Sequence, residues 1–446
     1  MTPPAPVRIV HLGLGNFFRA HQAWYTDACD SAREWGIAAF TGRSNPVAGI
    51  LGAQDGLYTL VERSARGDRA TIMCSISETN LGADIQRLVE LLRSPRTAIV
   101  TLTITEAGYR LGEAGLPDRG DPVVVDDLAA LRGLSSATPK VTSVLARLVV
   151  GLHARASAAA GPIAIVSCDN LPDNGMLTRT AVLALAEAVS LDLARWVADN
   201  VSFVSTSVDR ITPRTQVSDR SVAAALTGWD DVAPVITEPF ADWVLSGDFP
   251  AGRPRWEQAG ARFVDDIRPF ERRKLWLLNG AHSALAYMGI LRGHRTVAEA
   301  VADGACREQI ESLWDEAGRH LPTELLDLDE YRHALISRFE NPRIEHRLEQ
   351  IGEDGVAKLR ARIVPVLIAE RDGGRLGLAG TRAISSWVIL QLKGGGLRDA
   401  SQVGIDRALG SADPVRQLLA TLDERLAGDE LIVDTVRQTA ADAKLI

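Results

Sequence analysis

The stretch VRIVHLGLGNFFRAHQA, residues 7–23, indicates the fold of the N-terminal part of this chain. It opens with a short β-branched run, turns at Gly13-Leu14-Gly15, and continues with a pattern of helical character. This order suits a dinucleotide-binding turn, because the first glycine makes the turn and the second lets a pyrophosphate approach the helix N-terminus. Phe18 stands where Gly-x-Gly-x-x-Gly would close, so a purely structural tight turn is the alternative.

Further strand-like runs follow along the first half of the chain. Each is short, mostly apolar on both faces, and followed by polar residues or glycine, and helical patterns at 84–94 and 177–189 lie between several of them. Buried strands that alternate with helices predict a mostly parallel sheet covered by helices, an α/β fold of Rossmann type. The runs are GIAAFTG (36–42), TAIVTLTIT (97–105), PIAIVSCDN (162–170) and VSFVSTSVDR (201–210).

The pattern of apolar and polar residues changes near residue 265. Long amphipathic patterns of helical period take over, and strand-like runs nearly vanish. We therefore expect two domains: a Rossmann-type dinucleotide-binding domain over 1–265 and an all-α domain over 266–446 that binds substrate and carries the catalytic residues.

Composition limits the partners of this chain. Its 446 residues carry a net charge of −8 and no dense basic surface, which argues against nucleic acid. Four scattered cysteines indicate reduced thiols rather than disulfides or a zinc site. With neither a signal pattern nor a bilayer-spanning run in the sequence, we expect a soluble cytoplasmic protein, a monomer or small homo-oligomer, acting on a small molecule away from membranes.

The end of the second strand bears on the choice of cofactor. An NAD enzyme usually has a carboxylate there to hold the ribose 2′-hydroxyl, but residues 39–49 contain none. Arg43 could stack on an adenine ring, neutralise a 2′-phosphate, or simply be an exposed loop residue. NAD is the expected cofactor and NADP stays open.

The stretch KLWLLNGAHSALAY (274–287) is unusually polar for a core helix. On an ideal α-helix Glu271, Lys274, Asn279 and His282 share one side over three turns. A solvated stripe is the simple interpretation, but the apolar residues on either side favour a cleft. There a desolvated lysine has a lowered pKa and acts as a base, while an asparagine can donate to a developing alkoxide. No set of cysteines or closely spaced histidines supports a metal mechanism instead, so we expect none.

The sequence resembles the mannitol dehydrogenase family, the polyol-specific long-chain dehydrogenases and reductases. The likeness runs in family order over about residues 8 to 360. It is carried by HLGLGNFFRAHQAWYTD, TLTITEAGY, SCDNLPDNG, VDRITP, EPFADWVLSGDF, GRPRWEQAGARFVDDIRPFE, KLWLLNGAHSALAYMG and RFENPRIEHRLEQIGEDGVAKL.

The resemblance implies a metal-independent NAD(P)-dependent dehydrogenase that acts on a CH–OH group, with the site between the two domains. By motif position, Lys274 is the general base, Asn170 and Asn279 hold the reacting oxygen, and Glu271 serves as a proton or water gate. Substrate contacts are implied for His282, Asp209 and Lys358. Cofactor contacts are expected at Gly13, Leu14, Gly15, Asn16, Phe17, Arg19, Arg43, Thr105 and Glu106.

The branch of the family is read from NPRIEHRLEQIGEDGVAKL (341–359). Arg347 and Gln350 resemble the fructuronate reductase, or D-mannonate oxidoreductase, branch, and a guanidinium suits a sugar-acid carboxylate. Arg347 could instead pair with a neighbouring glutamate. The best interpretation is D-mannonate and D-fructuronate interconversion. A mannitol or arabinitol dehydrogenase is the alternative, followed by a non-catalytic NAD-binding protein.

Overall fold

A computed structural model of the chain describes residues 3–42, 46–134, 139–395 and 397–443. The chain divides into two compact units, Met1–Ile267 and Arg268–Ile446. The first unit is built on a mostly parallel sheet and the second is helical, which confirms the predicted fold class.

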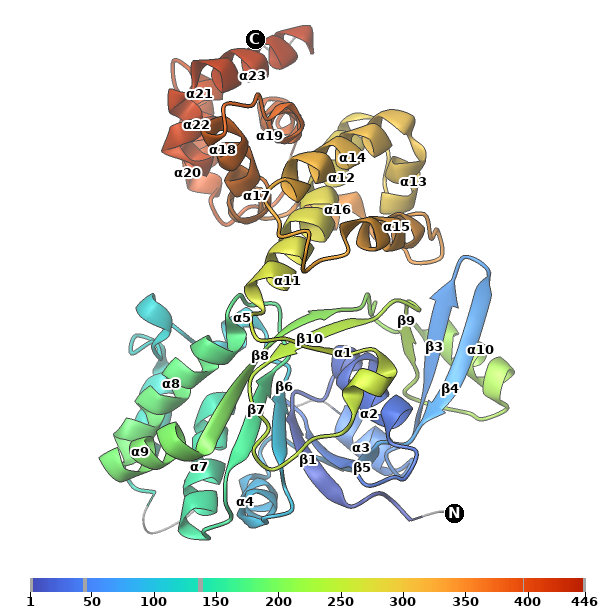
Figure 1. The fold of residues 1–446 in the computed structure, drawn as a ribbon, viewed down its shortest axis with the longest axis vertical. Coiled ribbons are helices and arrows are strands. Elements are labelled where there is room, and N and C mark those ends of the chain that lie inside the picture. Colours follow the sequence, from blue (N-terminus) through green and yellow to red (C-terminus); the bar gives the residue numbers. More distant parts are fainter. Residues whose placement is uncertain (1–2, 43–45, 135–138, 396, 444–446) are drawn as a thin grey trace. The chain divides into compact units, whose positions relative to one another are not determined.

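The first unit contains an eight-stranded sheet in the order β11-β10-β8-β7-β6-β1-β2-β5 (Figure 1). Six neighbouring strands of this sheet are parallel, namely β5, β2, β1, β6, β7 and β8. β10 runs antiparallel to β8. Their sequence order, 3-2-1-4-5-6, is that of a dinucleotide-binding Rossmann sheet and reverses between β1 and β6. The strands are β1 (Val7–Leu12), β2 (Gly36–Phe40), β5 (Ile76–Asn80), β6 (Ile99–Leu102), β7 (Ile163–Ser167), β8 (Val201–Asp209), β10 (Asp242–Ser246) and β11 (Arg262–Phe263).

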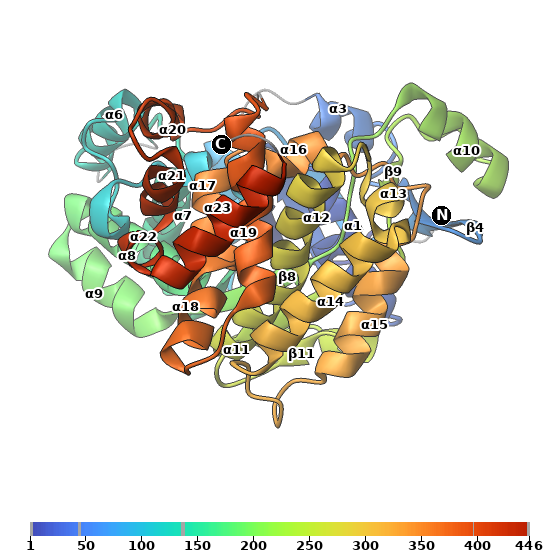
Figure 2. The ribbon, with the colours of Figure 1, turned by 90° about the horizontal axis from the view of Figure 1, so that it is seen from above.

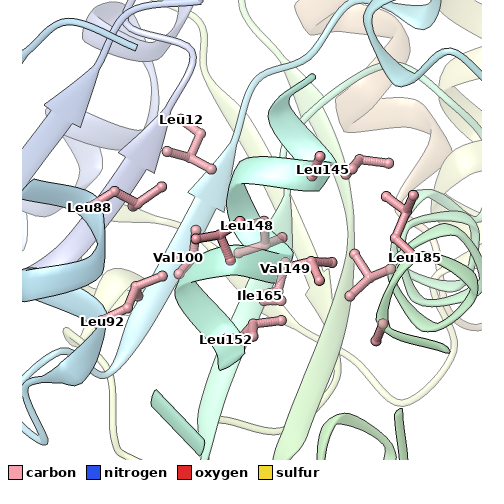
Figure 3. Packing of buried hydrophobic residues seen from close by; sticks show 14 of the residues in the cluster. Leu12, Leu88, Leu92, Val100, Leu145, Leu148, Val149, Leu152, Ile165 and Leu185 are labelled. Carbon is pink, nitrogen blue, oxygen red and sulfur yellow. The ribbon is translucent and has the colours of Figure 1, made fainter. Parts of the chain in front are cut away.

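Side chains of alternate residues along each central strand enter different cores. Val10 and Leu12 of β1 pack in one cluster, and Ile9 packs in the other. Figure 3 shows Leu145, Leu148, Val149 and Leu152 of one covering helix close to Val100 and Ile165 of the sheet. One face is covered by α4 (Ile85–Arg93), α7 (Val144–Ser157), α8 (Asn174–Val189) and α9 (Leu191–Asn200), and the other by α1 (Asn16–Ala20), α2 (Gln22–Cys29) and α3 (Val47–Gly52).

A smaller sheet in the order β4-β3-β9 adds to the second of these faces. β3 and β4 form an antiparallel hairpin, and β9 pairs with β3 in parallel. Its strands are β3 (Tyr58–Ser64), β4 (Gly67–Met73) and β9 (Val235–Thr237), and the remaining helices of the unit are α5 (Glu106–Tyr109), α6 (Pro122–Leu131) and α10 (Val217–Thr227).

The second unit is organised around α12 (Gly280–Leu291). Residues 280–287 of this helix are all buried, as expected for a helix surrounded by others. It packs against α14 and α19, which Figure 2 shows on either side of it. The other helices are α11 (Arg268–Arg273), α13 (Val297–Ala302), α14 (Gly304–Gly318), α15 (Leu328–Phe339), α16 (Leu348–Gly352), α17 (Gly355–Arg362), α18 (Val364–Asp372), α19 (Leu378–Leu392), α20 (Gln402–Leu409), α21 (Pro414–Leu422), α22 (Glu424–Gly428) and α23 (Glu430–Asp442).

Among the described helices of both units, none has the length and apolar character needed to cross a membrane.

Candidate active site

The glycine turn lies directly after β1, where the strand order of the sheet reverses. Gly13 has φ +124°, and a Cβ there would lie 2.3 Å from the backbone oxygen of Thr103, so this position requires glycine. Gly15 is extended, and a Cβ on it would meet only the oxygen of Gly13, at 3.6 Å. The chain's own packing does not require the second glycine, which therefore fits the close approach of a bound group.

The side chain of His11 stabilises this turn. The imidazole is fully buried, stacks on Phe18 at 3.5 Å between ring centroids, and is hydrogen-bonded to the hydroxyls of Thr101 (2.8 Å) and Thr103 (3.1 Å). Thr103 in turn donates to the backbone oxygen of Gly13 at 2.8 Å. Burial lowers the pKa of His11 to about 3, so the imidazole is neutral at physiological pH.

The carboxyl ends of β1, β6, β7 and β8 meet at one edge of the parallel sheet, where ligands of this architecture bind. Asp209 ends β8, and it is buried. A cavity of about 450 Å³ opens at this edge, and an adjoining cavity of about 740 Å³ reaches Leu14. The predicted residues that line the first cavity are Gly13, Gly15, Asn16, Phe17, Thr105, Glu106 and Asn170.

Arg19 occupies a different position from the one expected. Its guanidinium is buried and donates to the oxygens of Gly15 (3.3 Å) and Ala233 (2.5 Å) and to Oδ1 of Asn16 (2.8 Å). It lines neither cavity at the sheet edge. In this structure Arg19 holds the glycine turn in place from behind it.

Asn170 is exposed on the turn after β7, and its neighbour Asp169 anchors that turn. The Asp169 carboxylate accepts a hydrogen bond from the phenol of Tyr109 and another from the backbone N–H of Leu171 at 3.3 Å. Tyr109 ends α5, which follows Thr105. The two loops that border the cavity are therefore fastened to each other, a connection that the sequence motif alone did not reveal.

Arg43 lies outside the described residues. The nearest described arginine at the end of β2 is Arg147 of α7, which is buried and donates to the backbone oxygens of Gly42 (3.0 Å) and Thr142 (2.6 Å). It also lines the larger of the two cavities.

In the second unit, the helix that carries Lys274 departs from ideal α geometry. Residues Lys274–Asn279 form a π-helical turn between α11 and α12. The predicted angular positions assumed 100° per residue, which is wrong for this turn, because a π-helix turns less with each residue. Glu271, Lys274 and Asn279 are all half-buried on this segment. Turns of this kind are rare and are frequent at functional sites.

Side chains from other helices satisfy the backbone of the π turn. The indole Nε1 of Trp314, on α14, donates to the oxygen of Leu277 at 2.8 Å. Arg362, at the end of α17, donates from Nη1 to the oxygen of Asn279 at 3.4 Å and to Oγ of Ser283 at 3.1 Å. The widened turn is thus held by donors that a regular α-helix would not need.

His282 follows on α12 and is only 8% exposed. Burial, together with the nearby charges of His346, Arg338 and Arg362, holds its pKa well below the ordinary value of 6.5. Its Nε2 has no hydrogen-bond partner among the residues described. A neutral imidazole with an unused ring nitrogen is suited to bind a hydroxyl group.

Arg347 and Gln350, the residues used to read the branch, are both exposed, whereas the neighbouring His346 is half-buried. His346 packs against the ring of His282 at 4.8 Å between centroids, and burial lowers its pKa to about 4. The Arg347 side chain is 64% exposed and pairs with Glu345 at 2.6 Å, as the alternative interpretation of this residue supposed. Gln350 is also exposed.

Two cations of α17 lie close to the π turn and α12. Lys358 of α17 is half-buried and donates to the backbone oxygen of Ile351 at 3.0 Å. Arg362 lies one turn further along the same helix, and no role was predicted for it. Its spacing of four residues from Lys358 was a signal in the sequence that these side chains share one helix face.

One group of side chains has the composition of a metal site. His294, Asp303 and Cys306 have ligand atoms within 4.8 Å of one another. Both carboxylate oxygens of Asp303 accept hydrogen bonds from Arg292, at 2.6 and 3.1 Å, and a third bond joins this carboxylate to His294. An ion here would compete with a guanidinium, so the group is explained as an ion pair.

Comparisons with known proteins agree with this architecture. Residues 7–258 match the model of the mannitol dehydrogenase Rossmann domain, and residues 266–384 match that of the mannitol dehydrogenase C-terminal domain. The chain is 38% identical over 392 residues to D-mannonate oxidoreductase of Escherichia coli, covering 84% of this chain and 79% of that protein. It is 37% identical over 373 residues to D-arabinitol 4-dehydrogenase of Ralstonia nicotianae, covering 81% and 78%.

Among solved structures, the chain is similar to the Pseudomonas fluorescens mannitol 2-dehydrogenase ternary complex with NAD and D-mannitol. The TM-score is 0.80 at 32% identity, covering 99% of this chain and 92% of that one. The chain therefore belongs to the mannitol dehydrogenase family, whose members are oxidoreductases that act on CH–OH groups.

Proposed function

We propose that this protein is an NAD-dependent oxidoreductase that interconverts a secondary alcohol and a ketone on a sugar acid, with D-mannonate and D-fructuronate as the best substrate pair. The observation that carries the proposal is the helical segment of the second unit, where a π turn spans Lys274 to Asn279 and leads into α12, which carries the neutral His282.

In the proposed oxidation, Lys274 takes the proton from the substrate hydroxyl as general base. The side-chain amides of Asn170 and Asn279 donate hydrogen bonds to the oxygen as it gains negative charge. His282 holds a neighbouring hydroxyl, and Asp209 and Lys358 make further substrate contacts. Glu271 lies three residues before Lys274 on the same helix. It passes the proton that Lys274 has taken on to solvent. When bound, the nicotinamide cofactor accepts or returns the hydride.

The first unit supports a dinucleotide as cofactor. The glycine turn lies at the switch point of the sheet, and Gly15 is free of any steric requirement from the chain itself. The related mannitol 2-dehydrogenase was solved with NAD. NADP is the alternative, because residues 39–49 provide no carboxylate for a ribose 2′-hydroxyl.

Identity to relatives does not choose between sugar acid and polyol. D-mannonate oxidoreductase and D-arabinitol 4-dehydrogenase match this chain at 38% and 37%. The likeness of residues 341–359 to the fructuronate reductase branch favours the sugar acid, and a polyol dehydrogenase is the second candidate. A non-catalytic NAD-binding protein is disfavoured, because it would have no use for Lys274, Asn170, Asn279 and His282 together. We place the protein in the cytoplasm, as a monomer or small homo-oligomer.

The test is oxidation of NADH and, separately, NADPH, followed at the nicotinamide absorbance band. D-fructuronate, D-tagaturonate and D-fructose are offered side by side. We expect rapid oxidation of NADH with D-fructuronate and little with D-fructose. The reverse ranking would assign the chain to the polyol dehydrogenases, and cofactor binding without turnover of any ketose or keto-acid would contradict the proposed enzyme.

A further inference from the structure

Arg362 is a half-buried cation, and most of its hydrogen-bond donors have no partner among the described residues. Of its five N–H groups, only those on Nη1 have partners, the hydroxyl of Ser283 and the backbone oxygen of Asn279. Nε and Nη2 make no hydrogen bond to a described residue, and no described carboxylate lies within ion-pair distance of this guanidinium. Burial lowers its pKa.

Two buried arginines of the first unit have hydrogen-bond partners on all three guanidinium nitrogens. Arg155 donates to five backbone oxygens, those of Leu92, Ser94, Ala160, Gly161 and Pro162. Arg210 pairs with Glu62 at 2.7 Å and donates to two backbone oxygens. A desolvated cation without such partners is costly, so a guanidinium left in this state is suited to an anion from outside the chain.

The surroundings of Arg362 are positively charged or neutral. Lys358 lies on the same face of α17, one turn earlier, and its pKa is lowered by burial and by the charge of Arg362. The negative charges of Asp354, Glu353 and Asp399 raise the pKa of Lys358. They have no such effect on the pKa of Arg362. His282 is neutral and also experiences the charge of Arg362. Arg362 therefore contributes a positive field next to the proposed catalytic residues.

We propose that Arg362 binds the carboxylate of the sugar-acid substrate through its Nε and Nη2 donors, with Lys358 adding a second positive charge. The inference rests on the proposed function and names the group that would select an acid over a neutral polyol. A planar guanidinium edge binds a carboxylate in bidentate fashion, and a neutral sugar would leave its charge unmatched. Because Nη1 contacts the backbone of Asn279, the bound carboxylate would lie beside the residue that holds the reacting oxygen.

The same role was expected of Arg347, and the structure separates the two residues. Arg347 is mostly exposed and already has Glu345 as its partner, whereas Arg362 is half-buried and has no carboxylate partner. Variants of these two arginines therefore report which of them selects the acid.

The experiment compares kcat/KM for D-fructuronate and D-fructose in Arg362→Gln, Arg362→Lys and Arg347→Gln. Arg382→Gln, a change at an exposed arginine on α19, is the matched control. The ratio of the two substrates on one preparation does not depend on how much of a variant is folded. We expect Arg362→Gln to lower the acid-to-neutral ratio about ten- to hundredfold, Arg362→Lys to lower it less, and Arg347→Gln and Arg382→Gln to leave it unchanged.

Equal loss for both substrates in Arg362→Gln would make Arg362 a support of the π turn and overturn the inference. A selective loss in Arg347→Gln instead would overturn it in favour of Arg347. If the wild type reduces D-fructuronate alone, KM for this substrate must rise in Arg362→Gln while KM for NADH stays constant, and an unchanged substrate KM contradicts the inference. Failure of the wild type to reduce either sugar would instead contradict the proposed function.

Discussion

His11 shows how one residue links the proposed cofactor turn to stability. It is neutral and buried in the folded protein, with a pKa of about 3, against 6.5 when exposed. Between these values the unfolded chain binds a proton that the folded chain does not, so stability is fully present above pH 6.5 and is lost as pH falls. From pH 7.5 to pH 5, this residue alone is expected to lower the free energy of unfolding by about 2 kcal/mol.

Urea denaturation at pH 7.5 and pH 5, followed by circular dichroism, measures this difference. His11→Gln should be less stable than the wild type at pH 7.5 but lose about 2 kcal/mol less on acidification. His333→Gln, a change at an exposed histidine, is the control and should keep the wild-type dependence. An unchanged pH dependence in His11→Gln would contradict the buried, neutral state.

The sequence predicted the glycine turn but not the residue that supports it. Gly13 and Gly15 are adjacent to a strand, so a local pattern identifies them. The hydroxyls that hold His11 belong to Thr101 on the neighbouring strand β6 and to Thr103 just after it, about 90 residues later, and only the folded sheet brings them together. For the same reason, the connection between Tyr109 and Asp169 had no local signal.

Among the helices of the second unit, the π turn is a feature that the sequence did not predict. Apolar spacing identifies a helix, but α and π geometry differ by a single residue per turn, and the pattern of Lys274–Asn279 fits both. What distinguishes them is a donor from another helix, the indole of Trp314 at the oxygen of Leu277.

Trp314→Phe should therefore reduce activity as well as stability. Loss of this hydrogen bond is expected to cost about 1 kcal/mol, and the altered placement of Lys274 and Asn279 to lower kcat about ten- to hundredfold. The matched control is Trp387→Phe, at a fully buried tryptophan of α19 that makes no hydrogen bond to the π turn in the described structure. Thermal unfolding and steady-state kinetics separate the two effects. Equal kcat in both variants would show that the π turn does not position the base.

The sequence predicted the central strands of the larger sheet and missed the other strands. The runs that became β1, β2, β6, β7 and β8 are mostly buried, whereas β4 is mostly exposed and rich in polar residues. β10 joins the sheet antiparallel to β8, outside the strand–helix alternation that identified the others.

At the scale of the whole molecule, each of the two units supplies residues for the proposed function. The sheet edge with the glycine turn belongs to Met1–Ile267, and the helix with Lys274, Asn279 and His282 belongs to Arg268–Ile446. The change from strand–helix alternation to helical patterns made this class of architecture predictable. The proposed choice of substrate was less predictable, because in our proposal it depends on which arginine has no carboxylate partner.

Lys274 is the proposed catalytic base of a nicotinamide-dependent dehydrogenase. NADH binding, followed by fluorescence titration, and turnover of D-fructuronate are measured on Lys274→Ala, with the exposed Lys393→Ala of the same unit as the control. We predict that Lys274→Ala binds NADH nearly as the wild type does while kcat falls at least about hundredfold, and that Lys393→Ala retains both properties. Retained turnover in Lys274→Ala, or a loss of NADH binding in proportion to the loss of turnover, would contradict the account.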